Sequence, residues 1–382
     1  MISIVHVIDG LGWAGMEHMV ASLVRCIDKK RFKVTLLSEI PMRDSVVEQA
    51  AFLEKEGVRV RFLQKHHRKK FLAIEYARFF NDLKPQVVHS HSGVWRDSCI
   101  GAVLAKVPLL FHTEHGRVFL DDNRRTRLTH RILTQFRSGI ISVSDELRQF
   151  LIEEVHLPVA KVITIQNGID TDKYMPGNYK SRLRDELGIS PETVIVMAVG
   201  RINPVKDYET LVHAVSLVKH FLPNNMEFKT VIVGPETRDH LTGGGLLDRL
   251  RELSRKFNVE KNLIFLGKRT DVQELLRVAD IFVQTSLTEG LSMSIMEAMS
   301  TALPTVVTDV GGNRELVEHR VTGFLTHRKD PESIANALLK LIEDDEMRVS
   351  MGKKARNCIV EKFSLQAMTK KYEDLYMESL RE

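Results

Sequence analysis

The sequence is poor in cysteine and has no long apolar run. Its 382 residues include only Cys26, Cys99 and Cys358, which are too few and too scattered for a disulfide framework or a zinc cluster. No segment approaches the roughly 18 uninterrupted apolar residues of a membrane span. The N-terminus also has no basic stretch before its apolar run, so no signal peptide is expected. We therefore expect a cytoplasmic protein that is neither secreted nor integral to a membrane.

A large excess of one charge sign is also missing, although the charge is unevenly distributed. Hydrophobic residues make up 43% and charged residues 27% of the chain, which is typical of a folded protein with one large domain or two smaller ones. Residues 1–180 contain 27 Lys and Arg against 20 Asp and Glu, whereas residues 181–382 contain 28 against 30. The basic excess therefore belongs to the first half.

This excess gathers in two clusters that are interleaved with apolar side chains. The first contains Arg59, Arg61, Lys65, Arg68, Lys69 and Lys70, with Phe62 and Phe71, and the second Arg117, Arg124, Arg125, Arg127, Arg131 and Arg137, with Phe119, Leu128, Ile132 and Phe136. Such segments suit an anionic membrane surface or a phosphate-bearing substrate, and a solvated basic face is the alternative. Nucleic acid is not expected as a partner, because no helix-turn-helix, RNP or zinc-finger pattern occurs.

Short β-branched runs alternate with longer amphipathic stretches along the whole chain. In the first half the runs lie at 2–8, 32–37, 58–63, 87–91, 109–115, 139–144 and 162–168, and in the second at 194–200, 228–234, 262–267, 281–286, 304–311 and 322–326. Helical patterns follow near 207–221, 244–257, 271–278, 292–302 and 331–362. A polar segment with Pro176, Gly177 and Pro191 interrupts the rhythm at 170–192 and predicts a domain boundary. The alternation predicts two doubly wound parallel-sheet α/β domains in tandem.

Ligands of open α/β sheets bind beyond the carboxyl ends of the strands, so the loops after the strands are the candidate sites. Two such domains facing each other would form a cleft. The first loop carries Gly10, Gly12 and Gly15 ahead of a helix expected to start near Met16, and glycines there let backbone N–H groups approach a phosphate. Although these three glycines have the GxGxxG spacing, no acidic ribose-binding residue is evident at the usual distance, which disfavours a nicotinamide cofactor. A structural turn is the alternative.

Two further loops offer candidate catalytic groups. Residues Thr113–Gly116 place His115 at a strand end, where an imidazole can position or polarise a ligand oxygen; His6, His89, His91 and His112 are competing candidates. In the second half, Arg201 directly follows a strand and Lys206 lies five positions later. Both cations can reach one diphosphate and stabilise it as a leaving group, although a loop with two solvated cations would look the same.

The segment 286–313 carries two glutamates around a helix start. Glu289 precedes the helix and Glu297 lies inside it, so a diphosphate would fit between them on the backbone N–H groups of Leu291, Ser292 and Met293. The carboxylates would then bind sugar and ribose hydroxyls. Alternatively, Glu289 complements the helix dipole, and the spacing from Ser294 to Glu297 forms a capping box.

These residues together resemble glycosyltransferase family 4, which has the GT-B architecture, and the resemblance covers nearly the whole chain. It rests on an ordered set of motifs: GLGWAG at 10–15, EHG at 114–116, NGID at 167–170, GRINPVKD at 200–207, FLG at 265–267, EGLSMSIME at 289–297 and DVGGN at 309–313. The sequence is most similar to bacterial members that build capsule, exopolysaccharide or lipid-linked glycans.

The resemblance implies a role for each matching residue. Arg201 and Lys206 would hold the donor diphosphate, while Glu289 would contact the donor sugar and Glu297 the ribose. His115 would lie near the transferred sugar, Gly15 would approach the diphosphate, and Arg269 would contact the nucleobase. The sequence departs from the family at Ala14-Gly15, where two adjacent glycines are common, and at Leu291-Ser292, where many members have a further glycine. These departures bear on the first loop and on the sugar pocket.

The resemblance also implies the reaction and the domain limits. It implies transfer of a hexose to a glycan or lipid-linked acceptor with retention of the anomeric configuration, without a metal or a cofactor. The first expected donor is a UDP-sugar and the second is GDP-mannose. The expected domains are residues 1–178 on the acceptor side and 179–362 for the donor, and residues 363–382 would form a helix that crosses back to the first domain. A nucleotide-sugar epimerase of the same fold and a non-catalytic basic membrane-binding module remain the alternatives.

Overall fold

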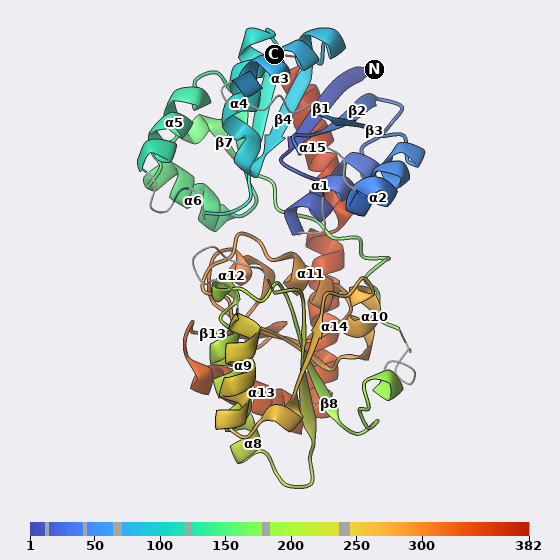
Figure 1. Cartoon of the computed structure of the whole chain (residues 1–382), viewed down its shortest axis with the longest axis vertical. Helices are drawn as coiled ribbons and strands as arrows, with labels where there is room; N and C mark the ends of the chain where they lie inside the picture. Colours follow the sequence, from blue (N-terminus) through green and yellow to red (C-terminus); the bar gives the residue numbers. More distant parts are fainter. Residues whose placement is uncertain are drawn as a thin grey trace. The chain divides into compact units, whose positions relative to one another are not determined.

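A computed structural model describes residues 1–11, 15–40, 44–63, 71–117, 120, 124–177, 184–236 and 245–381. The chain divides into two compact units (Figure 1). The first consists of Met1–Gly168 together with Leu365–Glu382, and the second of Ile169–Ser364. The division falls ahead of the polar segment 170–192, whereas the sequence suggested a limit at 178.

The first unit is built on a parallel sheet in which the described strands follow the order β3-β2-β1-β4-β5-β6-β7. The strands are β1 (Ile2–Ile8), β2 (Phe32–Ser38), β3 (Arg59–Phe62), β4 (Val87–His91), β5 (Leu109–Glu114), β6 (Gly139–Ser142) and β7 (Val162–Thr164). The helices are α1 (Gly15–Cys26), α2 (Asp44–Lys55), α3 (Leu72–Leu83), α4 (Trp95–Leu104), α5 (Arg124–Thr134), α6 (Asp145–Glu153) and α15 (Leu365–Ser379). The order reverses between β1 and β4, which is the switch point of a doubly wound sheet.

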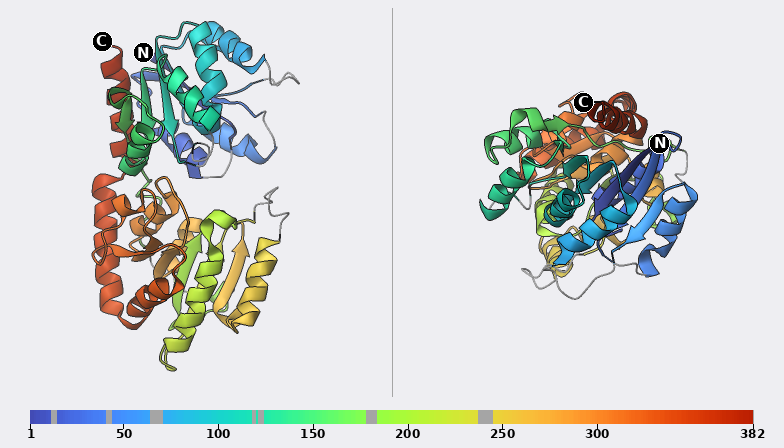
Figure 2. Two further views of the ribbon diagram at one scale, coloured as in Figure 1. Left: turned by 90° about the vertical axis from the view of Figure 1, so that its left-hand side faces the viewer. Right: turned by 90° about the horizontal axis from the view of Figure 1, so that it is seen from above.

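Side-chain alternation along the central strands separates two faces of this sheet. Val5 and Val88 pack with residues of α3 and α4 in one apolar cluster. The intervening residues point to the other side, where the rings of His6 and His89 lie 6.2 and 5.9 Å from that of Tyr376 on α15. The C-terminal helix α15 therefore packs on the first unit, as its label in Figure 1 and the red helix that ends at the C-terminus in Figure 2 show.

The second unit contains a parallel sheet in which the described strands follow the order β10-β9-β8-β11-β12-β13. The strands are β8 (Val194–Val199), β9 (Phe228–Val233), β10 (Leu263–Gly267), β11 (Ile281–Gln284), β12 (Thr305–Thr308) and β13 (Gly323–Thr326). The helices are α8 (Tyr208–Phe221), α9 (Leu246–Lys256), α10 (Val272–Val278), α11 (Met293–Ser300), α12 (Asn313–Leu316), α13 (Pro331–Glu343) and α14 (Asp345–Lys362). The switch point lies between β8 and β11.

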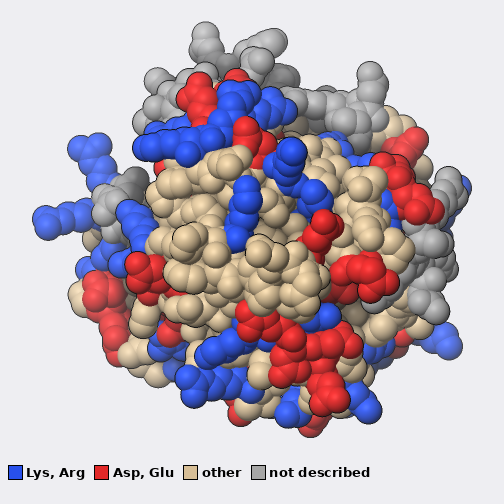
Figure 3. Space-filling view, turned by 90° about the horizontal axis from the view of Figure 1, so that it is seen from below, with Lys and Arg blue, Asp and Glu red and all other residues tan. Residues whose placement is uncertain are grey.

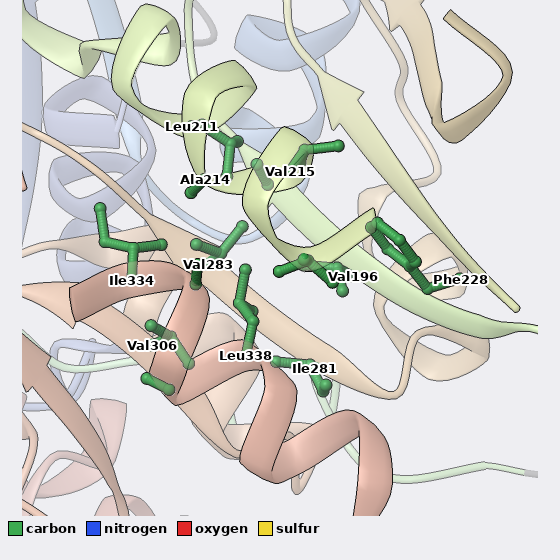
Figure 4. Packing of buried hydrophobic residues seen from close by; sticks show 14 of the residues in the cluster. Val196, Leu211, Ala214, Val215, Phe228, Ile281, Val283, Val306, Ile334 and Leu338 are labelled. Atoms are coloured by element: carbon green, nitrogen blue, oxygen red, sulfur yellow. The ribbon is translucent and has the colours of Figure 1, made fainter. Parts of the chain in front are cut away.

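Branched side chains from the strands fill the core beneath α8 and α13 (Figure 4). Val196, Val283 and Val306 come from three adjacent strands and are fully buried. Leu211 of α8 and Leu338 of α13 pack on them from the helices. Because β-branched side chains fit a pleated surface that is covered by helices, runs such as 194–199 form buried parallel strands.

The prediction of two doubly wound parallel-sheet domains is confirmed. One detail differs, because the helical pattern at 331–362 forms two helices instead of one. Asp344 separates them: it has extended backbone angles and its carboxylate accepts a hydrogen bond from the Met347 N–H at 2.8 Å. An aspartate in this position is a strong N-cap, so a new helix begins after it.

Candidate functional site

The candidate donor site lies at the carboxyl ends of β8 and β11 in the second unit. These neighbouring strands flank the switch point, from which the sheet extends in opposite directions. The loop after β8 contains Gly200, Arg201 and Lys206, and the loop after β11 contains Ser286 and Glu289. The two predicted cations and the first predicted glutamate therefore come from loops on either side of the position where ligands of this sheet class bind.

Lys206 and Glu289 form an ion pair across this switch point. The ammonium group lies 2.6 Å from Glu289 Oε1, and the Ser286 hydroxyl donates to the same oxygen at 2.6 Å. The two charged side chains are only 18% and 15% exposed. The Thr285 hydroxyl bonds the Lys206 carbonyl at 2.9 Å and so ties the two loops together. An anionic ligand that draws Lys206 from Glu289 would meet a poorly hydrated cation, which strengthens the electrostatic attraction.

Arg201 is not part of this pair. It follows Gly200 directly and its side chain is exposed. The structure thus brings Lys206 and Glu289 together and leaves Arg201 at the rim of the same loop. An exposed guanidinium can still turn toward a bound diphosphate, whose oxygens it would bind through a two-pronged fork.

Glycines allow the loops at this edge to touch through their backbones. A Cβ atom on Gly311 would lie 1.9 Å from the Glu289 carbonyl oxygen, and one on Gly234 would lie 2.0 Å from the Gly200 carbonyl oxygen. Their φ angles of +53° and +149° are also ones that other residues rarely adopt. The loop that carries Glu289 is therefore held by a backbone contact that a side chain would break.

The N-terminus of α11 points to the same edge. Its N-cap residue Ser292 makes no side-chain cap hydrogen bond; its hydroxyl instead accepts a hydrogen bond from Gln284 Nε2 at 3.0 Å. Leu291 and Ser292 are buried and Met293 is half-buried. A helix start without a side-chain cap suits a bound anion, because its first N–H groups and the helix dipole both favour negative charge.

Glu297 lies one turn farther along α11 and is bound by a residue that the sequence did not single out. The Tyr174 phenol donates a hydrogen bond to its carboxylate, and Lys173 adds a nearby positive charge. Burial outweighs both and raises the pKa of Glu297 to about 7. The alternative of a capping box with Ser294 does not hold, because the helix begins after Ser292. Nothing in the polar segment around Tyr174 marks it in sequence.

Arg269 lies at the carboxyl end of β10, two strands from β8. Its guanidinium bonds Asp271 Oδ2 at 2.6 Å and Glu186 Oε1 at 3.2 Å. These partners hold the pKa of Arg269 above its ordinary value. The structure therefore shows Arg269 in a surface ion-pair group, and its contact with a nucleobase stays a prediction.

In the first unit, Gly15 is the first residue of α1, but the loop before it, with Gly12, lies outside the described residues. His115 follows β5 at the carboxyl edge of the sheet, and its Nε2 lies 3.2 Å from His91 Nδ1. Burial lowers the pKa of His115 to about 3, so the ring is neutral. Two of the competing histidines belong to the surroundings of His115: His91 is bonded to it, and His6 Nδ1 lies 3.0 Å from His91 Nε2.

Side chains of types that can hold a metal ion gather in two groups in the first unit, one of them beside His115. Among the described residues, His112, Glu114 and His130 form one such group and His6, His89 and His91 another. Burial lowers the pKa of both histidines of the first group, and the charge of the buried Arg137 guanidinium beside them lowers it further. A cation is already present there, which opposes binding of a metal ion.

An Asp-x-Asp triplet, the residue pattern of many metal-dependent transferases, occurs at Asp170–Asp172, in a turn at the start of the second unit. The Asp170 carboxylate accepts the Lys173 N–H at 3.0 Å, and the Asp170 carbonyl accepts the Tyr174 N–H at 3.0 Å. The aspartate therefore closes a local turn that carries Tyr174 toward Glu297.

The sequence of this chain matches two family models of sugar-transferring enzymes. Residues 13–173 match the model described as Glycosyltransferase Family 4, and residues 180–358 match the one described as Glycosyl transferases group 1. A relative from Escherichia coli, UDP-Gal:alpha-D-GlcNAc-diphosphoundecaprenol alpha-1,3-galactosyltransferase, is 32% identical over 77% of this chain and 76% of its own. The chain belongs to glycosyltransferase family 4. It is thus an enzyme that moves a sugar from a donor onto an acceptor.

Solved structures show the same fold for this family 4 glycosyltransferase. A glycosyltransferase from Rickettsia africae superimposes with a TM-score of 0.85 at 20% identity, over 100% of this chain and 99% of that one. HepE from Anabaena, solved in complex with UDP and glucose, superimposes with a TM-score of 0.83 at 20% identity, over 99% of this chain and 100% of that one. At this identity the likeness establishes the fold, which is the GT-B architecture.

Proposed function

We propose that this enzyme transfers a hexose from a UDP-sugar to a glycan or lipid-linked acceptor in the synthesis of a bacterial surface polysaccharide. The name of the E. coli relative, which uses UDP-galactose and a sugar on diphosphoundecaprenol, supports this donor and acceptor class. GDP-mannose is the second donor to test. The observation that carries the proposal is the Lys206–Glu289 pair at the switch point, beside a helix start without a side-chain cap.

The geometry suits stabilisation of a departing diphosphate. We infer that Lys206, Arg201 and the first N–H groups of α11 bind the negative charge that develops as the bond from the anomeric carbon to the phosphate oxygen breaks. The acceptor hydroxyl oxygen forms the new bond to the anomeric carbon, and its proton passes to the phosphate oxygen that leaves. Attack from the side of the leaving group retains the anomeric configuration. Two cations take the place that a divalent metal holds in other transferases.

The two glutamates and His115 would orient the donor. Glu289 would accept hydrogen bonds from sugar hydroxyls after the diphosphate draws Lys206 away from it. Glu297 would accept those of the ribose, because an ionised carboxylate binds paired hydroxyl groups. His115 of the first unit would bond a hydroxyl of the transferred sugar. Gly15 would let the backbone approach the diphosphate, and Arg269 would contact the base.

A transfer assay tests this function. The enzyme is incubated with radiolabelled UDP-galactose, UDP-glucose, UDP-GlcNAc or GDP-mannose and with a lipid-diphosphate acceptor, with chelator present. We expect one donor to label the acceptor in the native enzyme and in the control Lys353→Ala, which removes an exposed lysine of α14. Lys206→Ala should lose the transfer. An epimerised sugar nucleotide formed without acceptor would support the epimerase instead, and full transfer by Lys206→Ala would refute the assigned site.

We also propose that α5 of the first unit binds an anionic membrane surface. Leu128 and Ile132 of α5 and Phe136, two residues after its end, recur every four residues and are 56%, 54% and 56% exposed, and Arg124 and Arg125 at the start of the helix are exposed too. The other arginines of this cluster are engaged: Arg117 and Arg127 face Glu146 and Glu154, Arg131 bonds the Val155 carbonyl, and Arg137 is buried against Trp95. An apolar stripe beside cations suits the lipid interface.

Figure 3 shows a face of the molecule on which both signs of charge surround an area without charged side chains and neither dominates. Most of the first basic cluster, 65–70, lies outside the described residues. No helix in the described part of the chain is long and apolar enough to cross a membrane.

Replacing Leu128, Ile132 and Phe136 by serine should abolish sedimentation with anionic vesicles at low salt. Unchanged sedimentation would refute the role of α5.

A further inference from the structure

Three histidines of the first unit form a hydrogen-bonded row that ends at His115. His6 Nδ1 lies 3.0 Å from His91 Nε2, and His91 Nδ1 lies 3.2 Å from His115 Nε2. His6 and His91 belong to β1 and β4, the strands on either side of the switch point. His6 and His91 are fully buried. The row therefore runs from the interior of the sheet to its carboxyl edge.

A second hydrogen-bonded chain holds the row in place. The His89 ring lies 4.4 Å from the His91 ring at an interplanar angle of 22°. His89 itself is fixed at both nitrogens, by the Tyr376 hydroxyl at 2.5 Å and the Thr113 hydroxyl at 2.7 Å. The ring of His91 thus stacks on a ring that cannot turn without breaking two hydrogen bonds, and its own two nitrogens are held by His6 and His115.

All three imidazoles of the row are neutral at physiological pH. Burial lowers the pKa of His6 and of His115 to about 3 and that of His91 well below its ordinary value, and the Lys29 ammonium adds to the effect on His6. Each ring therefore carries one N–H, on either Nδ1 or Nε2. Because the rings are bonded to one another, the tautomer of one ring decides that of the next.

The inner end of the row selects the direction of these hydrogen bonds. His6 Nε2 is buried and has no hydrogen-bond partner among the described residues. If the protons pointed inward, this atom would be a buried N–H without an acceptor, which is rare in folded proteins; an unpaired lone pair is tolerated more often. The outward direction is therefore favoured: His6 Nδ1 donates to His91 Nε2, and His91 Nδ1 donates to His115 Nε2.

We propose that His6 and His91 are positioning residues that fix His115 as the tautomer with its proton on Nδ1. His115 then presents a hydrogen-bond donor, and not an acceptor, to its ligand. The identity of that ligand as the transferred sugar rests on the proposed function, whereas the tautomer does not. A donor fixed before binding suits a sugar oxygen that has two lone pairs, and it avoids the loss of affinity that a mixture of tautomers would cause.

Nitrogen NMR of the full chain tests the tautomer directly. The histidines are labelled with ¹⁵N, two-bond ¹H–¹⁵N correlations are recorded, and the His115 signals are assigned from their loss in His115→Gln. We expect a protonated, pyrrole-like Nδ1 and an unprotonated, pyridine-like Nε2 in His115 without ligand. A pyrrole-like Nε2, or averaged shifts at both nitrogens, would overturn the proposal without any bearing on the enzyme's activity.

Two variants of His91 separate positioning from packing. His91→Leu removes the donor, so His115 should show averaged nitrogen shifts and kcat should fall about tenfold, the worth of one hydrogen bond. His91→Asn places an amide N–H near the former Nδ1 and should restore both the tautomer and most of the rate. The control His130→Gln replaces a buried histidine that lies outside the row and should change neither. An unchanged tautomer in His91→Leu would overturn the proposal, whereas failure of the native enzyme to bind any nucleotide would refute the proposed function instead.

Discussion

Donor binding is expected to depend on the ionisation of Glu297. Burial raises the pKa of this carboxyl to about 7, although the Tyr174 hydrogen bond and the Lys173 charge favour its ionised form. The free enzyme therefore holds a proton on Glu297 below pH 7 and loses it above. Only the ionised carboxylate accepts hydrogen bonds from both ribose hydroxyls. Affinity for the donor should thus be high above pH 7 and fall as the pH decreases through 7.

The size of this effect follows from the pKa. If only the ionised form binds, the dissociation constant rises about tenfold between pH 8 and pH 6. Tyr174→Phe removes a hydrogen bond that favours the ionised form, so it raises the pKa of Glu297 and moves the midpoint to higher pH. Glu297→Gln should bind more weakly, with an affinity that no longer changes with pH in this range.

Calorimetric titration with UDP-glucose between pH 5.5 and 8.5 measures these affinities. A sugar nucleotide is the suitable ligand, because UDP itself has a terminal phosphate that titrates in the same range. Heats measured in buffers of different ionisation enthalpy also count the protons released on binding. A native affinity that stays constant from pH 6 to pH 8, or an equally steep profile in Glu297→Gln, would refute this role of Glu297.

Three further substitutions test the site and its support. Lys206→Ala should lower kcat by about 10² to 10³, as removal of a preorganised charge does; steady-state rates within threefold of native would contradict this. Gly311→Ala forces a Cβ against the Glu289 carbonyl. It should abolish the thermal stabilisation by nucleotide while the circular dichroism spectrum stays unchanged; a variant that nucleotide still stabilises would contradict this. Arg184→Leu removes the guanidinium that lies 2.8 Å from the Asp280 carboxylate. The carboxylate keeps the Ile195 N–H but loses its buried counter-ion, which should lower the free energy of unfolding in urea by about 3–5 kcal/mol; a loss under 1 kcal/mol would count against it.

The fold could be predicted from the sequence because its signal is local. Alternation of β-branched runs with amphipathic stretches predicts parallel strands and covering helices without knowledge of any contact. The break in the last helical stretch was missed, although Asp344 is a strong capping residue in sequence. The helix break is hard to locate from the sequence, because two aspartates and a glutamate follow one another at 344–346 and such a run also suits a continuous exposed helix.

The pairings within the site could not be predicted, because they depend on strand order. Lys206 and Glu289 are 83 residues apart in sequence, and they meet because β11 lies beside β8 and not beside β10. The period of two places His89 and His91 on one face of β4, but only the pairing of β1 with β4 brings His6 into the row. Tyr174 reaches Glu297 through an irregular turn, for which no periodicity exists.

The central claim is that the carboxyl edge of the second sheet binds a nucleoside diphosphate sugar through Lys206. Thermal unfolding of the native enzyme and of Lys206→Ala, each with UDP, GDP, ADP and their sugar conjugates, tests it most directly. A ligand at one hundred times its dissociation constant should stabilise the native enzyme by about 2.7 kcal/mol. We predict such a shift with uridine nucleotides alone, and its loss in Lys206→Ala. An equal shift in both proteins would contradict the account.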